Sequence, residues 1–176
     1  MKYQSTIISA AIALSLAACG NSGEQQSHPS AYAPALAQTY VKVAKDRPSN
    51  LPSMLATTEP CSLDVVNDQP ALDTNSVADK ATVKFVGWAG NVASGTSPQE
   101  VWLEFIGTNS AYVKVIRGGK RPDVASSLNK PGLADAGWET YADLSPLAGG
   151  TYKIRVIMID GQQGLACETN RAVKIN

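Results

Sequence analysis

From Cys61 to the end of the chain, apolar and polar side chains alternate in short runs, and this period of two is typical of paired β-strands. The clearest run covers residues 152–156 (YKIRV), in which apolar and basic side chains point to opposite faces. Further strands are predicted near residues 62–65, 82–86, 101–106, 111–116, 165–168 and 172–175. Turns rich in glycine are predicted at residues 87–95, 107–109, 118–119, 149–150 and 160–161. The pattern predicts an all-β domain, an antiparallel β-sandwich of about seven to eight strands.

One segment, residues 121–128 (RPDVASSL), interrupts the alternation. Pro122 stands where a helix can begin, because its fixed backbone angle suits the first helical turn. Val124 and Leu128 are four residues apart and would share one helix face. Residues 130–132 (KPG) are predicted to cap the helix at its C-terminal end. We predict a single short helix inserted between two strands.

The first residues of the chain resemble the leader of an exported protein. Lys2 and the free amine precede an apolar stretch at residues 7–18, which is too short to cross a hydrocarbon core of ~30 Å as a permanent helix. Residues 16–19 (LAAC) resemble the lipobox of bacterial lipoproteins. The resemblance implies that residues 1–18 are removed as a signal peptide and that Cys19 is lipidated. The alternative is an ordinary secretory signal with a chance cysteine.

A lipid anchor would determine where the protein works. Each buried CH₂ contributes ~0.8 kcal/mol, so two or three acyl chains hold a protein on a membrane while one chain binds reversibly. In Gram-negative lipoproteins an aspartate after the lipidated cysteine favours the inner membrane, and this chain has Gly20 there. The resemblance therefore implies a cell-envelope protein anchored in the lipid bilayer. The outer membrane, facing the periplasm or the surface, is favoured over the inner membrane.

Composition divides the mature chain into a tether and a domain. Residues 19–59 are rich in glycine, serine, glutamine and proline and are predicted to form a flexible linker, within which residues 35–46 favour a short helix. The folded domain is predicted to span residues 60–176. Basic and acidic side chains number 15 each in the full sequence, so loss of Lys2 leaves 14 against 15. Without a basic surplus, a nucleic-acid partner is not expected.

Two cysteines, Cys61 and Cys167, remain once Cys19 is assigned to the lipid. In an oxidising compartment such a pair is predicted to form a disulfide bond, and two free thiols are the alternative. The bond would close a loop of about 106 residues and contribute roughly 4 to 5 kcal/mol in the chain-entropy model. It would also join the first predicted strand to one near the end of the chain.

Two further resemblances concern the domain. Residues 147–154 (LAGGTYKI) look like the corner of immunoglobulin-like domains, in which a tyrosine hydroxyl, here that of Tyr152, ties a turn to the next strand. The ordered set of residues 87–88 (GW), 121–125 (RPDVA), 137–138 (GW) and 150–152 (GTY) is similar to small β-sandwich modules of bacterial envelope proteins, some of them joined to polysaccharide-handling enzymes. The resemblance implies an immunoglobulin-like sandwich, while function depends on sites rather than folds.

The distribution of catalytic residue types argues against an enzyme. The only histidine, His28, lies in the predicted linker, so the domain lacks a Ser-His-Asp or Cys-His nucleophile and a His-Cys metal set. We therefore predict no catalytic residues, no cofactor and no metal ion. Carboxylates offer two alternatives. One is a calcium site from Asp64, Asp68 and Asp73. The other is an acid pair, either Asp135 with Glu139 or Glu100 with Glu104, although Glu100 and Glu104 on one strand face more often belong to a solvated surface.

A basic segment and two aromatic residues form the candidate ligand-binding set. Basic side chains bind carboxylates and aromatic rings pack on the apolar faces of sugar rings, so such a set could recognise an acidic sugar or a protein. The simpler interpretation is that Asp123 caps the predicted helix and that Arg121 pairs with a nearby acid. The candidate residues are Arg117, Lys120, Arg121, Asp123, Trp138 and Tyr141.

Three functions are compatible with these features. The preferred hypothesis is a non-enzymatic envelope lipoprotein whose sandwich domain binds a protein or glycan partner. A second is a lipoprotein of phage or mobile-element type that blocks an outer-membrane receptor or pilus component, or an accessory to pilus, secretion or polysaccharide assembly. A third is a hydrolase that would depend on Asp123, Asp135 or Glu139.

Overall fold

The computed structural model describes residues 40–176. The predicted signal peptide, the predicted lipidation site Cys19, the first part of the predicted linker and His28 lie outside the described residues. Between residues 40 and 176 no helix is long and apolar enough to cross a membrane.

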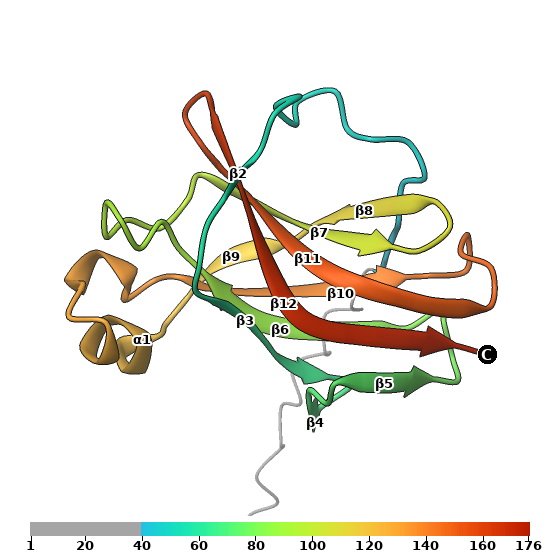
Figure 1. The fold of residues 1–176 in the computed structure, drawn as a ribbon. Helices are drawn as coiled ribbons and strands as arrows, with labels where there is room; N and C mark the ends of the chain where they lie inside the picture. Colours follow the sequence, from blue (N-terminus) through green and yellow to red (C-terminus); the bar gives the residue numbers. More distant parts are fainter. Residues whose placement is uncertain (1–39) are drawn as a thin grey trace, which may run out of the picture. The chain divides into compact units, whose positions relative to one another are not determined.

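The described chain forms two β-sheets that pack face to face (Figure 1). The first sheet has the order β1 (Val41–Lys42), β10 (Gly137–Asp143), β6 (Val83–Ala89), β3 (Cys61–Val66) and β4 (Gln69–Pro70), with β9 (Ile116–Gly119) also paired to β10. The second sheet has the order β2 (Ala56–Thr57), β12 (Gln163–Ile175), β11 (Gly150–Asp160), β7 (Glu100–Ile106) and β8 (Ser110–Lys114), with β5 (Thr74–Val77) also paired to β12.

This strand order confirms the predicted all-β sandwich and is that of an immunoglobulin-like domain. Strands β3, β6 and β10 take the places of strands A, B and E, and strands β12, β11, β7 and β8 take those of G, F, C and C′. Two details differ from the prediction. The sheets are mixed, because β1, β2 and β5 pair in parallel with their neighbours. The described chain has nine strands of four or more residues and three of two residues, not seven to eight.

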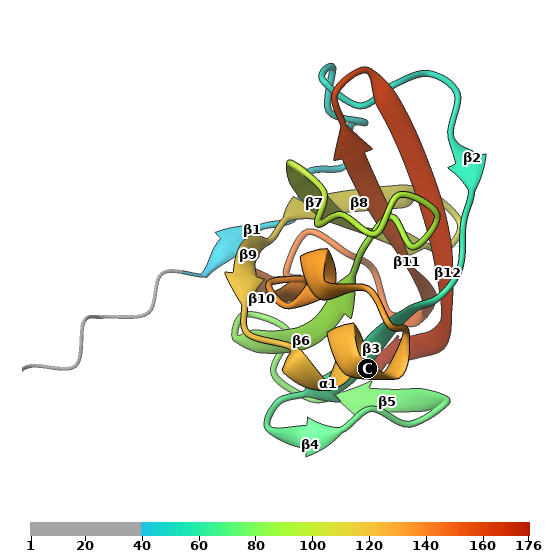
Figure 2. The same cartoon turned by 90° about the vertical axis from the view of Figure 1, so that its left-hand side faces the viewer.

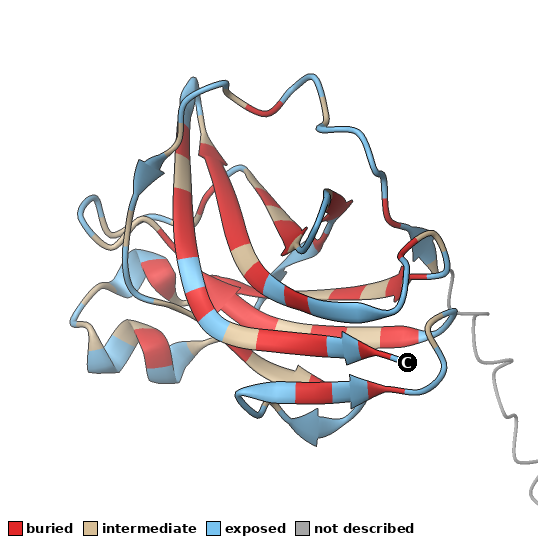
Figure 3. Ribbon diagram, turned by 45° about the vertical axis from the view of Figure 1, so that its right-hand side comes forward, coloured by how far each residue is buried: buried red, intermediate tan, exposed pale blue. Residues whose placement is uncertain are grey.

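The alternation of side chains builds the core between the sheets. Figure 3 shows buried and exposed positions following one another along the long strands. Phe85 of β6 and Phe105 of β7 are fully buried, and their rings meet edge to face with centroids 5.5 Å apart. Such a pair buries a large apolar area and adds a specific aromatic contact. The contact joins the centres of the two sheets.

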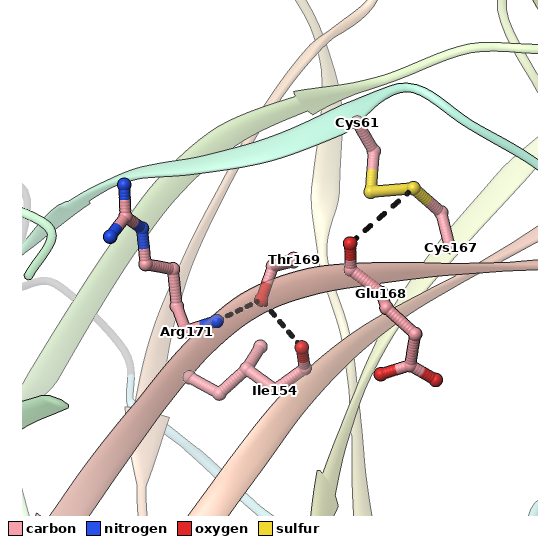
Figure 4. The surroundings of a disulfide bond; sticks show 6 residues. All are labelled: Cys61, Ile154, Cys167, Glu168, Thr169 and Arg171. Carbon is pink, nitrogen blue, oxygen red and sulfur yellow. Dashed lines mark hydrogen bonds between the residues drawn. A yellow bond between two sulfur atoms is a disulfide. The ribbon is translucent and has the colours of Figure 1, made fainter. Parts of the chain in front are cut away.

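Two predicted bonds, one between distant residues and one local, are present. Cys61 of β3 and Cys167 of β12 form the disulfide bond, which links the two sheets (Figure 4). The hydroxyl of Tyr152 donates a hydrogen bond of 3.1 Å to the carbonyl of Ala148, which ties the turn to β11. The Tyr152 ring lies so close to Gly107 that a Cβ there would be 2.6 Å from it, so this position admits only glycine.

The predicted helix is present as α1 (Pro122–Ser127), followed by the 3₁₀ helix η1 (Pro131–Leu133) (Figure 2). Asn129 has a positive φ of 51°, and the amides of Asn129 and Lys130 donate to the carbonyls of Ser126 and Ala125. This is a Schellman end, so the helix stops at Leu128 and Asn129 rather than at residues 130–132. The helical segment covers Trp88 at one end of the first sheet.

The N-terminal boundary of the domain differs from the prediction. Val43 and Leu51, assigned to the flexible linker, are only 4% and 5% exposed. The helix predicted for residues 35–46 is wrong over residues 40–46, where Val41–Lys42 form β1 beside β10; residues 35–39 lie outside the described part. An open edge of β10 offers backbone hydrogen bonds that a weak helical preference does not outweigh. The folded part therefore includes most of residues 40–59.

Three strand assignments also change. Strand β10 was not predicted, because its sequence GWETYAD mixes glycine and acidic residues with aromatic ones. The two strands predicted at 165–168 and 172–175 are one strand, β12, with a bulge opposite Ile154 and Arg155. Gly87 lies within β6, and Gly118 and Gly119 lie within β9, so these glycines do not form the predicted turns.

Candidate functional site: the outer face of the first sheet

Strands β6 and β10 carry a row of side chains that point away from the core. In their ladder Lys84 pairs with Tyr141, and Val86 pairs with Glu139. These four residues are half-buried, whereas their neighbours Phe85, Thr140 and Ala142 are buried. Because side chains of paired residues lie on the same face, the four define what we call the outer face of the first sheet.

A depression of about 200 Å³ lies on this face next to β9 and α1. We call it the glycine depression, because backbone of Gly87, Gly119 and Gly137 contributes to its lining. A Cβ on Gly137 would come within 2.6 Å of the Gly119 carbonyl oxygen, so β9 can approach β10 this closely because residue 137 is glycine. The remaining lining residues are Val86, Ile116, Arg117, Lys120, Arg121, Trp138 and Glu139.

The structure brings four of the six candidate residues to this depression: Arg117, Lys120, Arg121 and Trp138. Trp138, however, is only 2% exposed and belongs to the core between the sheets. Tyr141 is three residues further along the strand, and an odd spacing places the two side chains on opposite faces. The predicted aromatic pair is therefore wrong. The indole N–H of Trp138 has no hydrogen-bond partner within the described residues.

Arg121 is held by two carboxylates. Its Nη1 donates to Asp64 at 2.6 Å, and its Nη2 donates to Asp123 at 2.8 Å. The hydrogen bonds from Arg121 lower the pKa of Asp123 to about 2, and the same bond with Asp123 raises the pKa of Arg121. Arg121 thus pairs with nearby acids as the simpler interpretation predicted. The other part of that interpretation, that Asp123 caps the helix, is wrong, because α1 has no side-chain capping hydrogen bond.

The other basic residues differ in their partners. Lys120 forms a salt bridge of 2.6 Å with Asp135. Arg117 is exposed and forms no salt bridge with any residue of the described part. Because partners already neutralise Lys120 and Arg121, the predicted attraction for an acidic sugar is largely cancelled.

A second depression of about 200 Å³ lies on the same face and contains Tyr141. We call it the tyrosine depression. The rings of Tyr40 and Tyr141 meet edge to face, with centroids 5.6 Å apart. Lys84 lies with its Nζ 5.8 Å from the centre of the Tyr141 ring and donates to Asp68 at 2.7 Å. The bond with Asp68 raises the pKa of Lys84. Asn67 and Thr82 complete the lining.

Sequence reasoning missed Tyr40 and Asn67. Tyr40 stood in the predicted linker, where nothing local marks it as part of a sheet face. Asn67 and Asp68 have positive φ angles of 49° and 59° and form the two-residue loop between β3 and β4. This geometry suits asparagine and aspartate in a tight hairpin turn, so the dipeptide itself could have indicated the turn.

The carboxylates considered for calcium binding lie with different partners. Asp64 pairs with Arg121, Asp68 with Lys84, and Asp73 with Arg171. Within residues 40–176 no three histidine, cysteine, aspartate or glutamate residues are grouped as a metal site requires. The calcium alternative therefore has no support in this geometry.

The pair Glu100 and Glu104 lies on the second sheet, and the two residues have different surroundings. Glu104 is only 3% exposed, so its assignment to a solvated surface is wrong. Its carboxylate accepts hydrogen bonds from Arg155 at 2.6 Å and 2.9 Å and from the Tyr112 hydroxyl at 3.0 Å. Both partners stand opposite Glu104 on the neighbouring strands and cover it.

Comparison of the chain with models of protein families, with curated proteins and with solved structures returned no match.

Proposed function

We propose that this protein is a non-enzymatic lipoprotein of the bacterial cell envelope, anchored through Cys19, whose sandwich domain binds a protein or glycan partner. The lipobox-like residues 16–19 and the Gly20 that follows support an anchor at the outer membrane. The disulfide bond between Cys61 and Cys167 supports an oxidising compartment outside the cytoplasm.

The observation that carries the binding role is the outer face of the first sheet. It presents two shallow depressions that share one row of half-buried side chains, bounded by the helical segment around Trp88. Ile116, which is 66% accessible, lines the glycine depression beside Val86, and this apolar lining supports contact with a partner there.

The surroundings of the acidic residues support a binding role over hydrolysis. A general acid needs a pKa near the working pH, and the pKa of Asp123 is about 2. Asp135 is engaged by Lys120. Of the three acids named for a hydrolase, only Glu139 lies in a depression without a salt bridge among the described residues. A single carboxylate does not supply the acid and base pair that glycoside hydrolysis uses.

Anchoring is tested by labelling cells with an alkyne analogue of palmitate. The wild-type protein should carry the label and remain in the membrane fraction, and Cys19→Ser should lose both properties.

Binding is tested by placing a photo-crosslinking amino acid at Ile116, with Lys174 on the second sheet as the matched exposed control. We expect crosslinked partners from position 116 only. A soluble, unlabelled wild-type protein would refute the anchor, and equal crosslinking at both positions would refute the site.

A further inference from the structure

Strand β9 leaves one of its two edges without a strand partner. It pairs with β10 through Ile116, Arg117 and Gly119, and no other strand of residues 40–176 pairs with it. Within the same residues, no loop or turn forms a backbone hydrogen bond with β9. All four residues of the strand are exposed. An unpaired edge of this kind is a template on which a further strand can pair.

An extra residue in β9 places Ile116 and Gly119 on the same face. In the ladder with β10, Ile116 lies opposite Glu139. Gly119 lies opposite Gly137, and Gly118 between them has no partner in that ladder. Because Gly137 and Glu139 are two residues apart in β10, they share the outer face, and the bulge in β9 brings their partners to the same face. A projecting side chain and a missing side chain therefore stand side by side.

These two features are complementary to each other. The glycine depression, about 200 Å³, has room for one aliphatic side chain against Val86. Ile116 lines it but is 66% exposed, so most of its side chain projects into solvent. A surface that carries both a projection and a hollow of matching kind is self-complementary. Two-fold symmetric pairs of identical chains are built from such surfaces.

Antiparallel pairing of two copies through β9 satisfies both features at once. With the two-fold axis between Arg117 and Gly118, Ile116 of each copy lies opposite Gly119 of the other. Side chains of paired residues lie on the same face of a sheet. Each Ile116 side chain then lies over the Gly119 of the other copy, where no side chain obstructs the depression.

The unpaired charges of this edge have both signs. Arg117 and Glu139 line the glycine depression, and neither forms a salt bridge within the described chain. A symmetric pair therefore brings two such cations and two such anions to one interface. Lys120 beside them is already neutralised by Asp135. The edge consequently has no large excess of one charge that would keep two copies apart.

We propose that two copies of this chain pair through the free edge of β9, with Ile116 of each copy seated in the glycine depression of the other. This inference rests on the proposed function and names a second copy as the protein partner of the outer face. Stable interfaces bury roughly 1,200–2,000 Å², more than a short strand edge supplies. The pair therefore depends on anchoring both copies in one membrane, which raises their effective concentration.

The test uses the full-length protein in its membranes and a cysteine crosslink at the two-fold axis. Arg117→Cys places a thiol of each copy beside the axis, within reach of a disulfide bond to the same residue of the other copy. We expect a reducible dimer on a non-reducing gel for this variant and none for wild type. Lys174→Cys, at an exposed position of the second sheet, is the matched control and should remain monomeric.

Two further substitutions, made together with Arg117→Cys, test the contact itself. Ile116→Ser removes the projecting side chain, and Val86→Phe fills the depression from within. Each should lower the dimer yield roughly tenfold or more, because a symmetric pair loses the contact twice. Val86→Ala leaves the depression open and should keep the dimer. Thermal unfolding of every variant establishes that the fold is retained before yields are compared.

Absence of the dimer, an equal dimer yield for Lys174→Cys, or a yield that Ile116→Ser and Val86→Phe leave unchanged would overturn the inference. If no dimer forms while the photo-crosslinking amino acid at position 116 captures a different protein, the second copy is excluded and the binding role of the face stands. If no dimer forms and position 116 captures nothing, both proposals fall.

Discussion

At the scale of single residues, neighbours on adjacent strands determine whether a charged side chain is solvated or buried. Glu104 would be solvated on an isolated strand, but Tyr112 and Arg155 lie beside it in register and cover its carboxylate. Buried carboxylates are tolerated where charged and polar donors satisfy them. The hydrogen bonds from Arg155 and Tyr112 do so here.

Removing Arg155 should therefore destabilise the domain. Arg155→Met leaves the Glu104 carboxylate buried with only the Tyr112 hydroxyl, and we expect a loss of about 2–4 kcal/mol, below the largest costs of a broken buried pair because Arg155 is partly exposed. Urea unfolding measures the change. The double variant Glu104→Gln with Arg155→Met should recover part of the lost unfolding free energy. A loss below about 0.5 kcal/mol for Arg155→Met alone would contradict the role of Arg155 as the partner of the buried Glu104 carboxylate.

The pairing of Arg121 with Asp123 makes a prediction about pH. The pKa of Asp123 in the folded protein is about 2, below its ordinary value of 3.8. The pair therefore stabilises the fold at pH values above 3.8, and this contribution is lost as the pH falls through about 2. Carboxyl NMR titration should give a midpoint near 2 for wild type. Arg121→Gln should move the midpoint up toward 3.8, and an unchanged midpoint would exclude Arg121 as the cause.

At the scale of elements, the segment before β3 forms part of the domain. Leu51 packs with Tyr112, Ile157 and Ile159, and Leu55 and Trp102 lie against this cluster on the second sheet. The Asn50 amide donates to Glu100 at 3.0 Å, and Thr58 continues the contact through its amide to the carbonyl of Ala166. These contacts hold residues 50–58 on the sheet rather than in a tether.

Leu51→Ala should accordingly cost about 2–3 kcal/mol of unfolding free energy, because it removes buried methyl groups and leaves a cavity in the small cluster. Met54→Ala, at a position 85% exposed in the same segment, is the matched control and should change stability little. Chemical denaturation of both variants gives the comparison. If both variants changed the free energy of unfolding equally little, residues 50–58 would belong to the flexible linker and not to the domain.

At the scale of the whole molecule, the disulfide bond joins the two sheets of the sandwich. Cys61 and Cys167 are separated by 106 residues, and the bond joins β3 of one sheet to β12 of the other. A bond that closes a long loop reduces the entropy of the unfolded chain. Cys167 directly follows Ala166, which pairs with Thr57 of β2, so the bond lies beside the pairing of β12 with β2.

Replacing both cysteines by alanine should lower the free energy of unfolding by about 2–5 kcal/mol while leaving the fold recognisable by circular dichroism. Wild-type protein reduced with dithiothreitol is the control and should lose a similar amount. Because the double variant cannot be reduced, the reductant should leave its stability unchanged. A variant as stable as oxidised wild type would show that the bond contributes nothing to the fold.

Local features of the sequence determined the strands with clear alternation, the position of α1, the tie between Tyr152 and Ala148 and the pairing of Cys61 with Cys167. Each follows from interactions within a few residues or from the chemistry of two thiols. Only the tertiary structure decided that Trp138 faces the core, that Glu104 is buried, that Tyr40 joins Tyr141 and that the segment around Leu51 covers the second sheet. These outcomes depend on side chains far away in the sequence, because a strand acquires its two environments only when other strands pack against it.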